Sequence, residues 1–218
     1  MFHVPKLAMR RFIAILILLA GWSVATVSAQ WATVPAVNFS SLQLSQFNDQ
    51  ELEVPYFLNY FAQVANAVVE TGPNKGFPDI KVNRQPVDNQ PYNARVMEMQ
   101  LPVAYFYTAN RPWNRYYGDA SVRVRLEAML DRWTHIQNLP GSPDGDYDGL
   151  FSEYSATNWS LAPTSFGVQQ AAQAVDLIIN SGLPFDATIL ENARVSIRRA
   201  LMALYTRADM RAAATQYT

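Results

Sequence analysis

The sequence predicts an all-α fold built from antiparallel helix hairpins. Apolar residues recur at three- and four-residue steps in five segments, a spacing that places them on one face of a helix. These segments are residues 54–70, 92–109, 119–137, 161–180 and 186–206. Most are separated by Gly, Pro and Asn, and none shows the sustained alternation with β-branched residues that is typical of a strand. Because each helix has one apolar face, we expect the helices to stack on their neighbours.

The segment 119–137 gives the clearest helix signal. Asp119 can cap its first turn, because a carboxylate accepts hydrogen bonds from the free amides there. Its apolar stripe consists of Val122, Leu126, Met129, Trp133 and Ile136. The charged residues that lie off this stripe are Arg123, Arg125, Glu127 and Arg132.

Proline and glycine shape the two preceding helices. We expect the first helix to end before Gly72-Pro73, and a proline- and glycine-rich loop to cover residues 71–91. Within 92–109, Pro102 lacks a backbone donor and should kink the helix or mark a restart. The expected buried face of the first helix consists of Phe57, Tyr60, Phe61, Val64, Ala67 and Val68.

The last helices carry clear end signals. Pro163 is tolerated in a first turn and Gly182 ends that helix, whereas Asp186 can cap the next. The two apolar faces consist of Val168, Ala171, Val175 and Ile178, and of Leu190, Ala193, Ile197, Leu201 and Leu204. A sixth helix is expected near residue 208. Because the chain stops at Thr218 without a cap signal, we expect a truncated chain or one whose core needs further helices.

Residues 1–29 have the pattern of a signal peptide, and residues 30–218 form the expected helical domain. Three basic residues precede the apolar run Phe12 to Ala20, and Val27-Ser28-Ala29 fits a cleavage site. The alternative is an uncleaved membrane anchor, but the run is shorter than the roughly 20 residues of a spanning helix. The sequence thus predicts a secreted or periplasmic protein without stable membrane insertion after cleavage.

Composition excludes several classes of protein. The full chain of 218 residues has a net charge of −1 and is 50% hydrophobic, which argues against disorder. The sequence pI of about 6.1 argues against a nucleic-acid partner. There is no cysteine, so thiolate catalysis and cysteine-bound zinc are excluded. Cleavage after residue 29 would leave 14 basic and 18 acidic residues, a net charge of −4, and His135 as the single histidine.

The connection after residue 137 suggests calcium as the one candidate cofactor. Asp144, Asp146 and Asp148, followed by Gly149, match the start of a calcium-binding loop. The twelfth position, where such loops carry Glu, is Ser155. The alternative is an acidic turn that binds no metal.

The same connection carries residues that suit a polysaccharide or oligosaccharide. Trp159 offers a ring face to a sugar, and Asn158 can hold a uronate carboxyl group. Tyr154 and Glu153 are candidate acid or base groups. The alternative is that Tyr154 and Trp159 pack beneath the loop while Asn158 caps the following helix.

A second aromatic cluster precedes the helix at 119–137. Trp113, Tyr116 and Tyr117 could form a stacking platform, with Arg111 and Arg115 pairing an anionic group. The alternative is that these rings close the end of a helix pair. His135 lies off the apolar stripe of its helix and is interpreted as a solvated residue.

The serial hairpins with Asn/Trp-rich and Asp/Gly-rich loops resemble part of an (α/α) toroid. Such toroids occur in secreted polysaccharide lyases of the alginate, heparinase and chondroitin types. Residues 157–163 (TNWSLAP) are similar to the Asn-Trp segment that lines the chondroitin-type cleft, with one Trp where that pattern has two. The resemblance covers residues 50–218 in architecture and implies substrate contacts for Asn158 and Trp159.

Three functional hypotheses follow from the sequence. The first is a glycan-active toroid, specifically a polysaccharide lyase acting on uronate-containing glycans. The second is a non-catalytic glycan-binding protein. The third is a structural or interaction module of the envelope in which the aromatic residues are buried.

Overall fold

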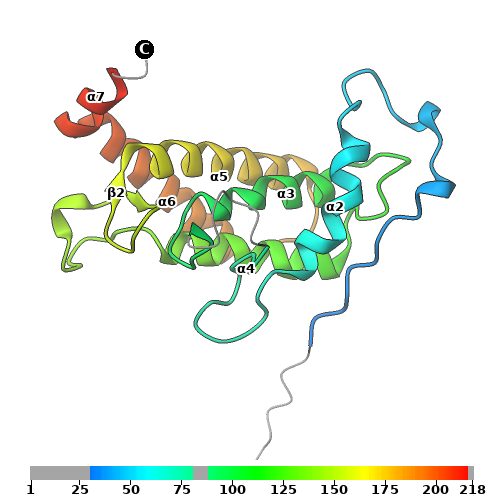
Figure 1. The fold of residues 1–218 in the computed structure, drawn as a ribbon, viewed down its shortest axis with the longest axis horizontal. Coiled ribbons are helices and arrows are strands. Elements are labelled where there is room, and N and C mark those ends of the chain that lie inside the picture. Colours follow the sequence, from blue (N-terminus) through cyan, green and yellow to red (C-terminus); the bar gives the residue numbers. More distant parts are fainter. Residues whose placement is uncertain (1–29, 81–87, 216–218) are drawn as a thin grey trace, which may run out of the picture. The chain divides into compact units, whose positions relative to one another are not determined.

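Four helices form the centre of the structure, which we describe from a computed structural model for residues 30–80 and 88–215 (Figure 1). The predicted signal peptide lies outside the described residues. The chain divides into two units, residues 1–30 and 31–218, and all elements described below belong to the second. Its α-helices are α2 (Val54–Asn66), α3 (Gln100–Thr108), α4 (Ala120–His135), α5 (Leu161–Ser181), α6 (Ala187–Thr206) and α7 (Ala208–Ala214).

Helices α3 to α6 form a four-helix bundle. α3 packs against α4 and α5, and α6 packs against the same two helices, so each has two neighbours. Residues 109–119 connect α3 to α4, and the shorter segment 182–186 connects α5 to α6, which makes two helix hairpins. The structure is mostly helical, as predicted, whereas no toroid is seen among the described residues.

Helix ends follow the predicted capping residues. The Asp119 carboxylate accepts hydrogen bonds from the amides of Ser121 and Val122, at 2.7 and 3.2 Å. Asp186 does the same for Thr188 and Ile189, at 2.8 and 3.0 Å. α5 begins two residues before Pro163 and ends at Gly182, whose φ of 66° is left-handed. These ends were predictable because they depend on local hydrogen bonding.

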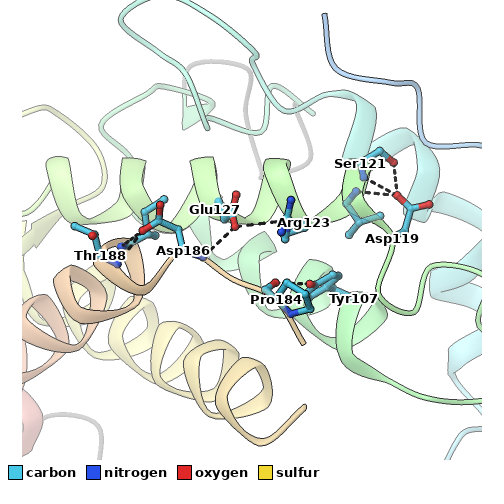
Figure 2. Close-up of polar contacts among 10 residues, drawn as sticks. Tyr107, Asp119, Ser121, Arg123, Glu127, Pro184, Asp186 and Thr188 are labelled. Atoms are coloured by element: carbon cyan, nitrogen blue, oxygen red, sulfur yellow. Dashed lines mark hydrogen bonds and ion pairs between the residues drawn. The ribbon is translucent and has the colours of Figure 1, made fainter. Parts of the chain in front are cut away.

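The connection between α5 and α6 is tied to the other hairpin by side chains (Figure 2). Tyr107 on α3 donates from its hydroxyl to the Pro184 carbonyl at 2.6 Å. Glu127 on α4 accepts from the Asp186 amide at 3.1 Å and lies 3.8 Å from the Arg123 guanidinium. These contacts fix one end of the bundle and thereby the spacing of α3 and α5.

Helix faces were predicted well for α4 and α5 but only partly for α2 and α6. All five stripe residues of α4 are buried, as are the four of α5. On α2 the expected Phe57 and Tyr60 are exposed, because the buried face is rotated to Leu58, Phe61, Ala62 and Ala65. On α6 the small residues Ala193, Ser196, Ala200 and Ala203 face the bundle and leave Leu201 exposed.

The segment 92–109 contains a restart rather than one helix. A 3-10 turn covers Val96–Met99, and α3 then begins with Pro102 in its first turn, where a missing amide donor costs nothing. In the part of the chain that the structure describes, further 3-10 turns cover Phe39–Ser41, Leu44–Gln46 and Gly145–Tyr147.

Two short strands were not predicted. β1 (Phe151–Ser152) pairs antiparallel with β2 (Trp159–Ser160), in the register Phe151 to Ser160. Two residues are too few to show a period in sequence, so pattern reasoning could not find them. Among the described residues, no helix is both long enough and apolar enough to cross a membrane.

Candidate functional site

Two rings of the aromatic cluster that precedes α4, Trp113 and Tyr116, are packed inside the protein. Trp113 is 2% exposed, stacks on Phe47 at 5.6 Å and donates from Nε1 to Glu51 at 3.3 Å. Tyr116 is 0% exposed, and its hydroxyl donates to the Pro35 carbonyl at 2.9 Å. Neither ring offers a face to a ligand, so the stacking platform expected from Trp113 and Tyr116 is not formed, and both rings close the end of the hairpin.

The remaining members of that cluster are exposed. Tyr117 lies at the surface, and Arg115 donates to the Ala36 carbonyl at 3.2 Å. Arg115 thus ties the N-terminal segment to the α3–α4 connection. Without the two buried rings, these residues do not make a sugar platform.

The three expected calcium ligands bind different partners. The Asp144 carboxylate accepts from Trp159 Nε1 at 3.1 Å, and Asp148 lies 3.6 Å from the Arg199 guanidinium. Asp146 uses its backbone carbonyl as acceptor for Arg207. In the described part of the chain, no three His, Asp or Glu side chains are grouped to hold a metal ion. The arrangement is that of an acidic turn held by protein partners.

The expected catalytic residues share one loop but differ in exposure. Glu153 is buried, whereas Tyr154 is 59% exposed and Asn158 also lies at the surface. Trp159 is half-buried through its bond to Asp144. Asn158 does not cap α5, since Ser160 holds that position. The loop therefore presents a phenol, an amide and part of an indole to solvent.

The two predicted clusters lie at opposite ends of α4 (Figure 1). Residues 105–117 precede its first residue, and residues 144–159 follow its last. A helix of this length spans about 24 Å. The structure therefore does not bring the aromatic cluster and the carboxylate-bearing loop together in one pocket.

A groove of about 910 Å³ lies between α2, α3 and α5, beside the aromatic cluster at 105–117, from which it takes Tyr105 and Phe106, and without any residue of the loop at 144–159. Its apolar lining includes Phe57 from α2, Tyr105 from α3 and Leu177 from α5. The other apolar lining residues are Val54, Met99, Leu101, Pro102, Phe106 and Ala172. A groove with these walls can bind an apolar group.

Carboxylates and amides form the polar part of the groove. Glu98 pairs with Arg95 at 2.7 Å, whereas Glu53 and Asp176 form no ion pair with any described residue. Gln50, Gln170 and Gln173 add amide groups. The groove thus combines an apolar floor with net negative charge.

The partly buried ion pair of Glu51 and Arg111 acts on the groove residue Tyr105. Burial opposes ionisation of Glu51, but hydrogen bonds from Arg111, the Asn48 amide and Trp113 outweigh it, so the pKa of Glu51 is lowered. Burial, together with the Glu51 charge, raises the pKa of the groove residue Tyr105 despite the opposing charge of Arg111. Tyr105 therefore stays a neutral phenol at physiological pH.

Exposed aromatic side chains continue the apolar surface beyond the groove. Phe57 contacts Tyr56 edge to face at 5.5 Å, and Tyr56 contacts Tyr60 at 5.3 Å. All three are exposed. Exposed aromatic groups of this kind mark interaction surfaces. Sequence reasoning missed this site because it assigned Phe57 and Tyr60 to the core.

Comparisons with protein-family models, with curated proteins and with solved structures gave no significant match.

Proposed function

We propose that this chain is an exported, non-catalytic helical interaction module that binds an apolar, positively charged helix in the α2–α3–α5 groove. The observation that carries the proposal is the acid-rimmed apolar groove of about 910 Å³. Binding is favoured over catalysis because the lining is mainly apolar. Its polar groups lie around this floor and suit orientation of a charged partner.

The dimensions of the groove fit an amphipathic helix. On α5 the lining runs from Gln170 to Leu177, which is about 10 Å of helix axis, or two turns. Helix-in-groove recognition uses apolar anchors over such a length. The aromatic surface of Tyr56 and Tyr60 extends past the groove, which favours a macromolecular partner over an enclosed small molecule.

The charge of the rim favours a cationic partner. Glu53 directly precedes α2 and Asp176 lies on α5, so basic groups on either side of a docked helix would each meet a carboxylate. Because such pairs are partly desolvated on binding, they contribute to orientation and selectivity as well as to association rate.

A peptide titration tests this function. A helical Leu/Lys peptide should bind the exported chain, and a Leu/Glu peptide of the same length should not. Affinity for the Leu/Lys peptide should fall with added salt and drop about tenfold in Glu53→Gln/Asp176→Asn. Asp131→Asn on α4 is the matched control and should leave binding unchanged. Failure of the Leu/Lys peptide to bind, or equal binding of the two peptides, would contradict the proposal.

Glycan binding by the loop at 153–159 is a second candidate. It is favoured by the exposed Tyr154 and Asn158 beside the half-buried Trp159. The polysaccharide lyase activity and the (α/α) toroid implied by the family resemblance belong to this candidate. Incubation with alginate, hyaluronan or heparin distinguishes lyase activity from glycan binding without catalysis. New unsaturated sugar ends indicate a lyase, whereas retention on the immobilised glycan without new ends indicates binding alone.

A further inference from the structure

We propose that the helix in the groove is the exposed face of α6 from a second copy of this chain, so that copies associate head to tail. The proposal rests on the proposed function, because it names the occupant of the same groove. The supporting observation is a second surface, on α6, that is apolar like the groove and carries the opposite charge.

The C-terminal half of α6 exposes an apolar face. Its fully buried residues are small, and several of its large side chains are exposed. Met202 is 58% exposed and Tyr205 77% exposed. Val195 and Leu201 are also exposed. Four exposed large apolar groups on one helix form a patch that normally marks a contact surface.

The same face carries excess positive charge. Arg194 and Arg198 both pair with Glu191, at 3.7 and 2.8 Å, so two guanidinium groups share one carboxylate. Arg194, Arg198, Leu201 and Tyr205 follow one another at four-, three- and four-residue steps, which places them on one side of the helix. Residues 194–205 thus form a cationic apolar helix face, called here the α6 face.

The α6 face and the groove are complementary. The groove offers an apolar floor with Glu53 and Asp176 at its edge, and the α6 face offers apolar side chains with two arginines. The exposed stretch from Val195 to Tyr205 is about 15 Å long, enough to cover two turns of groove. Both surfaces lie on each chain but on different helices, so the contact is heterologous and builds rings or filaments.

Sedimentation velocity of the exported chain at increasing concentration tests self-association. We expect the average mass to rise with concentration, and to fall with added salt or with the Leu/Lys peptide, which competes for the groove. A wild-type chain that remains monomeric at every concentration while still binding that peptide would overturn this inference and leave the proposed function standing. If the chain neither associates nor binds the peptide, both fail.

Charge reversal distinguishes this contact from any other. The groove variant is Glu53→Lys/Asp176→Lys, and the face variant is Arg194→Glu/Arg198→Glu. Each alone juxtaposes like charges, so its self-association should be at least about tenfold weaker. Mixing the two variants should restore assembly, because each reversed surface then meets its opposite. Asp131→Lys is the control and should associate like the wild type.

The mixing experiment also separates misfolding from loss of contact. All four substituted side chains lie at the surface, and circular dichroism with thermal melts shows whether each variant folds. Folded variants that do not assemble when mixed would overturn the proposal, as would variants that associate as well as the wild type.

Discussion

Glu51 and Arg111 form a two-point ion pair. Glu51 Oε1 lies 2.6 Å from Arg111 Nε, and Arg111 Nη2 donates to Oε2 at 2.8 Å. Glu51 also accepts from the Asn48 amide at 2.9 Å and from Trp113. The pair therefore joins the segment before α2 to the α3–α4 connection, and it holds the helix that forms one wall of the groove.

Stability should fall on acidification through protonation of Glu51. Because its pKa is lower in the folded chain, the stabilisation is fully present above the unfolded pKa and is lost as pH falls through the folded pKa. Urea unfolding from about pH 7 to about pH 3 should show a steep loss of stability in the wild type. Glu51→Gln should be less stable than the wild type at neutral pH, and its free energy of unfolding should fall less steeply as the pH is lowered. Glu191→Gln, at an exposed position, serves as the control. If the free energy of unfolding of Glu51→Gln fell with pH as steeply as that of the wild type, Glu51 would not be the group responsible.

Substitution of two buried glutamines, Gln100 and Gln137, by methionine should have different effects on the free energy of unfolding. Gln100 is fully buried, and neither polar atom of its amide has a partner among the described protein groups. Gln137 donates to the carbonyls of Gly149 and Ser196, at 3.0 and 2.9 Å, and accepts from the Ser196 hydroxyl. Gln100→Met should therefore be neutral or raise the free energy of unfolding by about 1 kcal/mol.

Gln137→Met should lower the free energy of unfolding by about 2 kcal/mol, since it leaves buried carbonyls without a donor. Chemical denaturation of both variants checks the pair of values. Equal losses in Gln100→Met and Gln137→Met would show that the Gln100 amide is satisfied in solution.

Gly76 should not tolerate a side chain. Its φ is +84°, and an added Cβ would lie 1.9 Å from the Ala128 carbonyl oxygen on α4. Gly72 has a similar φ of +78° but open space around it. We expect Gly76→Ala to cost more than about 3 kcal/mol, and Gly72→Ala about 1 kcal/mol from backbone strain alone. Thermal melts of the two variants provide the comparison, and similar melting temperatures would argue against close packing of the loop on α4.

Arg125 should hold the N-terminal segment in place. Although it was expected off the apolar stripe, its side chain is buried and donates to the Ala32 carbonyl at 2.9 Å and the Ser121 carbonyl at 2.8 Å. Burial lowers the pKa of Arg125, though it remains charged at physiological pH.

Arg125→Met should therefore loosen residues 31–37 more than the bundle. The expected readout is faster hydrogen exchange at the Val34 amide, which donates to Asn66 at 2.9 Å, with little change in α5. Arg194→Met, at an exposed position on α6, is the control. Uniform acceleration across the chain would indicate global destabilisation instead.

Local signals predicted the helices, and tertiary packing decided which residues could form a site. Capping by Asp119 and Asp186 depends on neighbouring backbone amides, so it could be predicted from the sequence. Burial of Trp113 depends on Phe47 and Glu51, more than sixty residues away, and no local pattern reports such a contact. The local sequence around an aromatic residue in a helix connection is the same whether the ring is buried at the end of the bundle or exposed to a ligand.

By itself, the sequence determined the helical class, most helix ends and the buried stripes of α4 and α5, because periodicity and capping act within a few residues. Only the packing of the helices shows that the aromatic cluster and the acidic loop lie at opposite ends of α4. It also creates the apolar groove between α2, α3 and α5. The small residues of α6 allow close packing on one side, while Leu201, Met202 and Tyr205 remain exposed. A three-helix groove and an exposed helix face are products of packing, since each depends on how separate helices are rotated against one another.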